Sequence, residues 1–481
     1  MAKIVPGGNH TPGLRRVLGR GDLILLFIVA VSNLNMVPPI SASGPITLWL
    51  WLMALIFYFW PQGAAVTELS QKWPGEGGIY LWAKRSFGEQ HGFIAGWCYW
   101  LSNVFYLPTV VLSCVGVGLY VFGPRIQHLE NNPVFTSSMA IGILLFLLVL
   151  NIRGLSLGKW INNLGGAGTI GGAAVVVLLA ALTLQHHGSA LHRVDLRPQF
   201  DWRLIAVFGT ICYSLVGLDI ASIMGDEIRE PKRNLPVAIF WGGLAAALIY
   251  LGTTAAMLIA VPHQEIGILS GILQAINVMA RHNGLLAVVA PLAFLECLAI
   301  LGTASAWFSG AARLPFVAGI DRYLPPIVGR IHPRYQTPYV SLILYAVLSS
   351  LLTLMSFLGV SVGEAYLTLL DLAVILQLLP TCYLFGALLK HTLDEQSSLN
   401  GPRTYLLANG IAGLTAATVG LIVAFIPSRQ VNSIWLYEIK LVIGCVLVFG
   451  SAFLFYRNAL RTAPGAEQVA DAAAALTGSG E

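Results

Sequence analysis

The chain has 481 residues, of which 56% are hydrophobic and only 10% carry a charge, and its mean hydropathy is +0.75. A soluble domain typically carries about 25% charged residues, so this composition excludes a soluble protein and indicates an integral membrane protein. The apolar runs are long and continuous, which excludes a barrel of short alternating strands and favours an α-helical bundle. The net charge of +5 requires no nucleic-acid partner, because membrane topology explains where the basic residues lie.

Twelve apolar segments are candidates to cross the bilayer as helices, which needs about 20 residues each. They cover residues 22–45, 47–70, 91–122, 136–152, 160–184, 203–227, 235–261, 284–311, 338–357, 361–389, 404–426 and 433–456. With a cytoplasmic N-terminus, about 20 of the 27 Lys and Arg residues fall in inside loops and ends. This bias follows the positive-inside rule and predicts that both termini are cytoplasmic. We expect the membrane to be a plasma membrane, such as a bacterial inner membrane.

The first predicted span is interrupted near its middle. Asn33 and Asn35 are poor helix formers. Pro38 and Pro39 then remove two backbone donors and disfavour helix geometry before them. We therefore expect the helix to break around Asn33, with Met36 inside the broken region.

The sixth predicted span also contains an interruption. Its apolar sequence is broken within six residues by Ser214, Gly217 and Asp219. A glycine weakens the helix there, and a carboxylate at membrane depth costs about 2.5–3.5 kcal/mol without a partner or water. A broken spanning helix beside an ionisable group is typical of a transporter's binding site. The alternative is a tilted helix with a packing glycine and a buried Asp219 bonded to a neighbour.

The two interrupted spans occupy matching positions if the first ten spans divide as five plus five. That arrangement is the one expected of an inverted repeat, in which the two breaks face each other across the substrate. Two independently kinked helices would not explain the matched position, and we therefore predict the repeat.

Three stretches resemble the amino acid–polyamine–organocation superfamily. Residues 67–101 contain a Pro-x-x-Gly-Gly-x-Tyr segment and a Gly-Phe-x-x-Gly-Trp entry to the third span, and they resemble the bacterial branch of glutamate–GABA antiporters. Residues 226–236 are similar to the superfamily's Glu-x-x-x-Pro-x-Arg-x-x-Pro motif, and residues 309–325 to its eighth-span exit. The resemblance implies a LeuT-like core of ten helices plus two peripheral helices, which moves amino acids or related amines by alternating access. The implied division is a cytoplasmic segment 1–21, a transport core 22–389, peripheral helices 390–457 and a disordered cytoplasmic tail 458–481.

Two departures from the superfamily pattern concern substrate binding and coupling. The glycine-rich sequence of the usual first span, which captures a substrate carboxylate, is replaced by 32–36, Ser-Asn-Leu-Asn-Met. The amides of Asn33 and Asn35, with the backbone freed by the prolines, are the alternative carboxylate-binding groups. Where many members carry a lysine linked to proton coupling, this chain has Gly168 or Thr169. The resemblance therefore favours exchange or a different proton carrier. Hydroxyls of Ser305 and Ser309 leave sodium coupling as a further alternative.

The candidate site residues are polar groups placed at membrane depth. Candidates for substrate binding are Asn33, Asn35, Met36, Asn103, Tyr106, Tyr213, Ser214, Gly217 and Asp219. Intramembrane carboxylates are functional hypotheses by default, and the candidates for proton transfer or coupling are Asp219, Glu296 and Asp371, the last also a candidate for gating or packing. An intracellular salt-bridge gate is expected from Glu68, Arg85, Glu227 and Arg233.

The competing functions are proton-coupled uptake of cationic amines or polyamines and a non-transporting amino-acid sensor. An enzyme is not expected, because neither H-E-x-x-H nor G-x-S-x-G occurs and no His/Asp cluster lies in an apolar segment. The six cysteines are scattered singly, which predicts neither a disulfide framework nor a metal site. We expect no cofactor. The sequence leaves open the substrate, the direction of transport and the oligomeric state.

Overall fold

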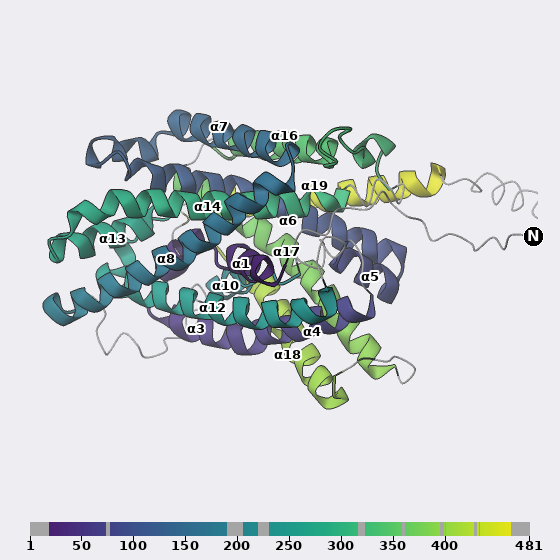
Figure 1. The fold of residues 1–481 in the computed structure, drawn as a ribbon. Helices are drawn as coiled ribbons and strands as arrows, with labels where there is room; N and C mark the ends of the chain where they lie inside the picture. The colour runs from purple at the N-terminus through teal and green to yellow at the C-terminus, as the bar shows by residue number, and fades with distance from the viewer. Residues whose placement is uncertain are drawn as a thin grey trace, which may run out of the picture.

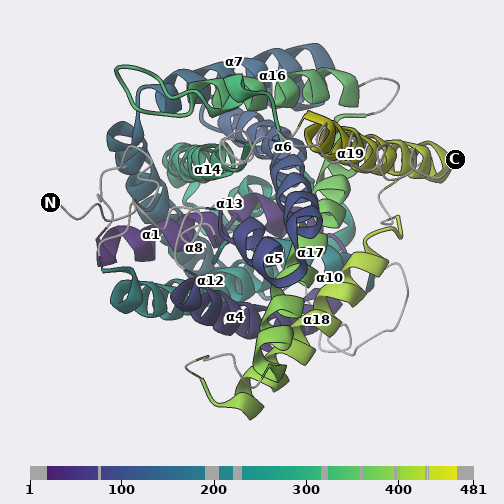
Figure 2. The same ribbon diagram turned by 90° about the vertical axis from the view of Figure 1, so that its right-hand side faces the viewer.

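A computed structural model describes residues 19–73, 77–189, 205–219, 230–315, 323–357, 361–394, 399, 401–427, 431 and 433–462. These described residues form helices joined by short connections and contain no β-strand. Figure 1 and Figure 2 show the helices packed as one bundle. The first half of the chain contributes α1 (Arg20–Val31), η1 (Leu34–Met36), α2 (Val37–Ser41), α3 (Ile46–Ala54), η2 (Leu55–Phe59), α4 (Trp60–Lys72), α5 (Ile79–Phe87), α6 (Glu89–Leu119), η3 (Pro124–Asn131), α7 (Pro133–Ile152), α8 (Leu155–His187) and α10 (Val207–Ser214).

The second half continues the bundle with longer helices. It contributes α12 (Pro231–Ala260), η6 (His263–Glu265), α13 (Gly271–His282), η7 (Leu286–Val288), α14 (Val289–Ala311), η8 (Pro326–Gly329), α16 (Tyr339–Ser356), α17 (Val362–Leu393), α18 (Arg403–Val423) and α19 (Ile434–Thr462). Among the described residues, ten helical stretches are long and apolar enough to cross a membrane. The chain is thus a multi-pass helical membrane protein.

Ten of the twelve predicted spans correspond to these ten stretches. The predicted ninth span is the shorter apolar helix Tyr339–Met355. The predicted sixth span begins with α10 and continues into residues 220–229, which lie outside the described residues. The number of twelve spans and the inverted repeat therefore stay predictions. Helix α13 was not predicted, because it is a short, half-buried helix between two spans.

Helix α1 lies in the middle of the bundle, where it contacts α8, α12 and α14. Seven of its twelve residues are buried, so it is apolar on most of its circumference, as a central helix in a bundle must be. The pair α7 and α16 packs together at one edge of the bundle (Figure 1), and α18 and α19 lie at the periphery in Figure 2. The core therefore surrounds the first broken helix.

Helices α8 and α14 approach unusually closely because glycines face each other. A Cβ placed on Gly165 would lie 2.8 Å from the Cα of Gly302, and one on Gly168 would lie 3.2 Å from the carbonyl oxygen of Leu295. Small residues are what allow two membrane helices to come so near, since van der Waals contact replaces the hydrophobic effect in lipid. Helices α8 and α14 both contact α1 as well, so this packing surrounds the site described next.

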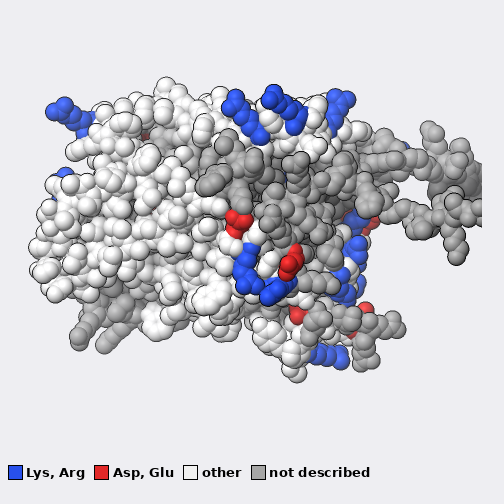
Figure 3. Space-filling view, viewed as in Figure 1, with Lys and Arg blue, Asp and Glu red and all other residues white. Residues whose placement is uncertain are grey.

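Charged side chains are unevenly distributed over the surface. In Figure 3, Lys and Arg gather over the right-hand part of the molecule, and most of the left-hand part is uncharged. Many large apolar side chains are exposed around the bundle, including Leu248 and Leu454, each 66% exposed, and Leu447, 67% exposed. Such a surface faces hydrocarbon rather than water, in agreement with a membrane location.

Candidate functional site

The first spanning helix ends at Val31 and resumes after two non-helical residues. Ser32 has φ −88° and ψ 73°, and Asn33 is extended at φ −86° and ψ 93°. A short turn, η1, and the proline-containing helix α2 follow. The amide of Asn33 explains part of this geometry, because its Nδ2 donates to the carbonyl of Ala30 at 3.1 Å and competes with the helix bonds there.

Carbonyl groups freed by this interruption are bonded by side chains from other helices. Buried carbonyls without a partner would each cost about 1–3 kcal/mol, so such bonding is needed at membrane depth. The donors are Thr303 to Val29 at 3.1 Å, the indole of Trp307 to Ala30 at 3.0 Å, Tyr250 to Val31, and Tyr366 to Asn35 at 3.1 Å. Three helices, α12, α14 and α17, therefore hold the interrupted backbone in place.

The non-helical residues 215–219 that follow α10, which we call the second interruption, lie directly against the first. Helix α10 ends at Ser214, and Gly217 adopts φ +135°, a conformation that side chains strongly disfavour. A Cβ on Gly217 would lie 3.1 Å from both the carbonyl carbon and the carbonyl oxygen of Ala30. Glycine is therefore required at position 217 for two reasons, which are the backbone angle and the close approach of the two broken segments.

Tyr250 of α12 joins the two interruptions through its hydroxyl. The hydroxyl accepts the backbone N–H of Asn33 at 2.9 Å and lies within donating distance of the carbonyls of Val31 and Ser214, the latter at 2.9 Å. Its single proton serves one of these carbonyls at a time. The ring stacks on Trp51 with centroids 4.3 Å apart, which fixes its position.

Helix α6 presents a polar strip to both interruptions. Tyr99, Asn103 and Tyr106 are spaced so that they share one face of a helix. The hydroxyl of Tyr99 lies beside the buried carboxylate of Asp219. At the other end, Tyr106 packs edge-on against Tyr213 with centroids 5.3 Å apart, and its hydroxyl lies near the amide of Asn35. The strip thus links Asp219 to the first interruption.

Several buried polar atoms around the interruptions have no hydrogen bond of standard geometry within the described structure. They are the Ser32 hydroxyl, Asn33 Oδ1, Asn35 Nδ2, Asn103 Oδ1 and the Tyr106 hydroxyl. Asn33 and Asn103 both use Nδ2 to donate to carbonyls one turn earlier, at 3.1 and 2.8 Å, which leaves their oxygens as acceptors. Asn35 Nδ2 and the two hydroxyls are donors. The region therefore offers both kinds of hydrogen-bonding group to a small polar solute.

Of the other predicted binding residues, Met36 is fully buried in η1. Ser214 uses its hydroxyl to donate to the carbonyl of Thr210 at 2.8 Å, so only its backbone carbonyl faces Tyr250. The structure thus brings Asn33, Asn35, Tyr106 and Tyr213 together, with Gly217 against the first interruption.

Two predicted coupling residues lie elsewhere. Glu296 is 3% exposed on α14, and a Cβ on Gly172 of α8 would lie 3.2 Å from its Oε2. It is seven residues from Thr303, about 10 Å along the helix, and its Oε1 has no hydrogen bond among the described residues. Asp371 accepts a hydrogen bond from Tyr437 of α19, which supports a packing role between α17 and a peripheral helix.

Three of the four predicted gate residues lie among the residues that the structure describes. Glu68 is 9% exposed near the end of α4, and Arg85 is exposed at the end of α5. Arg233 pairs with Glu230 at 3.9 Å, and both side chains are more than 70% exposed, so the pair contributes little. Glu227 lies outside the described residues. The gate therefore stays a prediction.

Comparison with known proteins supplies the family. The sequence model of a family described as "Amino acid permease" matches residues 18–449, the range that contains both interruptions. The chain belongs to the amino acid permease family. This confirms the resemblance to the amino acid–polyamine–organocation superfamily and makes the permease a transporter rather than an enzyme.

Relatives of this permease are named as transporters. An uncharacterized transporter of Legionella pneumophila is 26% identical over 465 residues, 94% of this chain and 98% of that protein. A probable agmatine/putrescine antiporter of Lactococcus lactis is 24% identical over 309 residues, 63% of this chain and 64% of that protein. An uncharacterized transporter of Mycobacterium tuberculosis is 24% identical over 348 residues, 70% of this chain and 74% of that protein.

Sequence reasoning missed Tyr250, Thr303, Trp307 and Tyr366 as supports of the interruptions. Each lies 217 or more residues from the backbone group of the first interruption that it bonds. Their only local signal is a hydrogen-bonding side chain inside an apolar segment, which many packing residues share.

Proposed function

We propose that this permease exchanges small amines or amino acids across the membrane by alternating access, with the substrate held between the two interruptions. The observation that carries the proposal is the set of buried polar atoms without a hydrogen bond of standard geometry around residues 32–35 and the α6 strip. Leaving such atoms without partners costs about 1–3 kcal/mol each. A polar substrate that bonds to them offsets that cost when it is bound.

The chemistry of the atoms indicates the substrate class. The oxygens of Asn33 and Asn103 are acceptors suited to an ammonium group, and the Asp219 carboxylate lies at one end of the same strip. The donors Asn35 Nδ2 and the Tyr106 hydroxyl suit a carboxylate or another acceptor at the other end. An amino acid or an amino-acid-derived amine carries groups of these kinds, and the agmatine/putrescine antiporter among the relatives supports exchange of amines.

Proteoliposomes test exchange directly. Vesicles loaded with agmatine, putrescine or an amino acid should take up the labelled compound faster than empty vesicles, and equal rates in both would rule out exchange. Asn103→Ala should weaken uptake by about tenfold, the equivalent of one lost hydrogen bond to a charged group. Asn151→Ala is the matched control, because Asn151 is a buried asparagine on α7 whose amide donates to Leu147 and Ser305 rather than to either interruption.

Proton-coupled uptake is the second candidate, and the buried Glu296 favours it. Its Oε1 is enclosed between α14 and α8 without a hydrogen bond in the described part of the chain, as expected of a group that gains and loses a proton. Uptake into empty vesicles driven by a pH gradient, and lost in Glu296→Gln, would support this candidate over exchange.

A further inference from the structure

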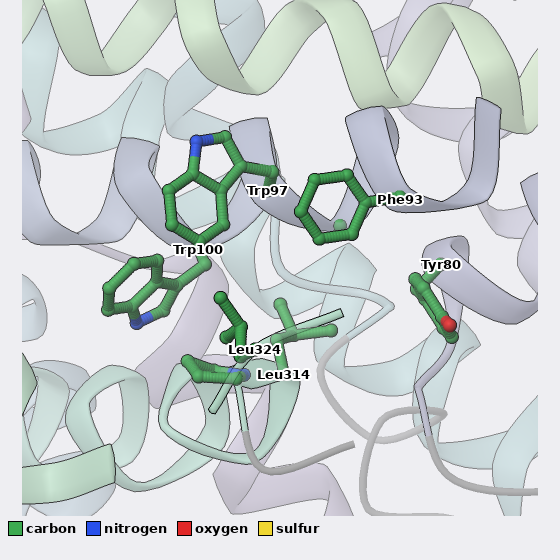
Figure 4. A pocket seen from close by; sticks show the side chains of 8 residues that line it. Tyr80, Phe93, Trp97, Trp100, Leu314 and Leu324 are labelled. Atoms are coloured by element: carbon green, nitrogen blue, oxygen red, sulfur yellow. The ribbon is translucent and has the colours of Figure 1, made fainter. Parts of the chain in front are cut away.

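A large apolar groove lies on the outside of the bundle, away from the two interruptions. It has a volume of about 520 Å³ and is bounded by α6, the segment at η8, α16 and α19. Pockets that bind small molecules typically measure about 300–1,000 Å³. Figure 4 shows a smaller pocket beside this groove, and Trp97, Trp100 and Leu324 line both.

The polar atoms at this groove are mostly bonded to the protein itself. The indole N–H of Trp97 donates to the carbonyl of Val448 at 3.2 Å and to the hydroxyl of Ser451 at 3.1 Å. That hydroxyl in turn donates to the carbonyl of Val448 at 2.8 Å. Apart from Ser451, the remaining lining is aliphatic, aromatic or proline, so the groove selects an apolar occupant.

The groove opens towards the lipid-facing surface. Leu351 of α16 and Leu447 of α19 both line it and are 50% and 67% exposed. Because α16 and α19 are apolar helices of a membrane bundle, these side chains lie at hydrocarbon depth. A hydrocarbon chain therefore reaches the groove without crossing water.

Two arginines lie within two residues of the groove lining, near where the stacked rings of Tyr323 and Tyr456 bring the segment before η8 and the end of α19 together. Arg330 follows the lining residue Val328 by two positions, and Arg457 follows the lining residue Phe455 by two. Both arginines are exposed, and neither forms an ion pair with a carboxylate of the described residues. Basic residues where a helix leaves the bilayer attract anionic headgroups at about 1 kcal/mol each.

We propose that this groove binds an acyl chain of an anionic phospholipid, with its phosphate group held by Arg330 and Arg457. The bound chain packs between α6 and α16, which are already joined by the Tyr345 hydroxyl to the carbonyl of Asn103 at 2.9 Å and by Ser349 to Val104 at 3.1 Å. The lipid therefore stabilises the packing of the helix that carries the polar strip. This inference is independent of what the permease transports.

Native mass spectrometry of the full chain from nanodiscs tests the proposal. With equal phosphatidylglycerol and phosphatidylcholine, we expect one retained phosphatidylglycerol and a preference of about 25-fold, since two arginines contribute about fivefold each. Leu348→Trp, and the more exposed Leu351→Trp, fill the groove and should abolish retention. Leu145→Trp, on the exposed face of α7, is the matched control and should retain the lipid. The double variant Arg330→Gln/Arg457→Gln should bind both lipids equally.

Four results would overturn the proposal. They are no retained lipid in the wild type, equal retention of the two lipids by the wild type, retention by both groove variants, and a dimer that the groove variants dissociate while lipid binding stays unchanged. The last result would assign the groove to a second copy of the chain. Thermal unfolding in detergent gives an independent readout, because phosphatidylglycerol should raise the melting temperature of the wild type and of Leu145→Trp but not that of Leu351→Trp.

Discussion

Replacing Tyr250 by phenylalanine removes a single oxygen atom that bonds to both interruptions. In the wild type the hydroxyl accepts the N–H of Asn33 at 2.9 Å and reaches the carbonyl of Ser214 at 2.9 Å. The phenylalanine ring keeps the stacking on Trp51, for which the ring centroids are 4.3 Å apart. The substitution therefore tests the hydrogen bonds and leaves the packing in place.

The expected magnitude follows from the groups left without partners. A buried carbonyl that loses its hydrogen bond costs about 1–3 kcal/mol. Tyr250→Phe removes the hydrogen bond to the carbonyl of Ser214, whereas the N–H of Asn33 keeps its bond to the carbonyl of Val31 at 3.0 Å. If the conformation in which the two interruptions contact each other becomes less stable by about 2 kcal/mol, and the substrate binds that conformation, substrate affinity falls about 30-fold. Exchange in proteoliposomes should fall accordingly, and the melting temperature in detergent should decrease.

The matched control is Tyr58→Phe. Tyr58 is also fully buried, but its hydroxyl has no hydrogen bond of standard geometry among the described residues. Its removal should lower exchange and melting temperature less than the removal of the Tyr250 hydroxyl does, because no backbone group loses a hydrogen bond. Wild-type exchange and wild-type stability in Tyr250→Phe would refute the reasoning that this hydroxyl holds the two interruptions together.

Three further substitutions test other parts of the account. Gly217→Ala should reduce exchange by tenfold or more, because φ +135° and the 3.1 Å approach to Ala30 cost about 1–3 kcal/mol in strain. Gly171→Ala, where a Cβ would meet only the Leu295 side chain at 3.6 Å, should be tolerated, and equal effects of the two would contradict the required glycine. Asp219→Asn should abolish or redirect exchange, as measured with labelled amines and neutral amino acids, and an unchanged substrate profile would remove Asp219 from the site. Burial raises the pKa of Glu130 above its ordinary value of 4.5 despite its hydrogen bond from Ser270. The folded state therefore favours the protonated Glu130 carboxyl. The contribution of this carboxyl to the free energy of unfolding is lost as the pH rises from its ordinary pKa through its raised pKa in the folded protein. The difference in melting temperature between the wild type and Glu130→Gln should fall across that interval, and a constant difference would disprove the assignment.

Local sequence signals predicted where the first spanning helix is interrupted. Asn33 and the proline pair at 38–39 act through their own backbone, so their effect is visible without knowledge of the fold. Gly217 similarly indicated a weak point, and the structure adds the reason that only glycine fits there, which is the contact with Ala30. Intramembrane polarity likewise indicated Asn103 and Tyr106 on the strip of α6.

The hydrogen-bond partners that side chains find on other helices of the bundle were not predictable from the sequence. Tyr250 gives the same local signal as any buried tyrosine, and its role depends on α12 packing beside α1. Asp371 was identified as a polar group, but whether it served coupling or packing depended on Tyr437, which is 66 residues away. Long-range contacts of this kind are set by the tertiary arrangement and leave no periodic pattern in the chain.

The most direct test of the account is a cryo-electron microscopy map of the permease with a bound substrate identified by the exchange assay. We predict substrate density between the segment 32–35 and Gly217, with an ammonium group in contact with Asn33 Oδ1 or Asn103 Oδ1. Substrate density elsewhere, or an unbroken helix through Asn33 with the substrate bound, would contradict the central claim.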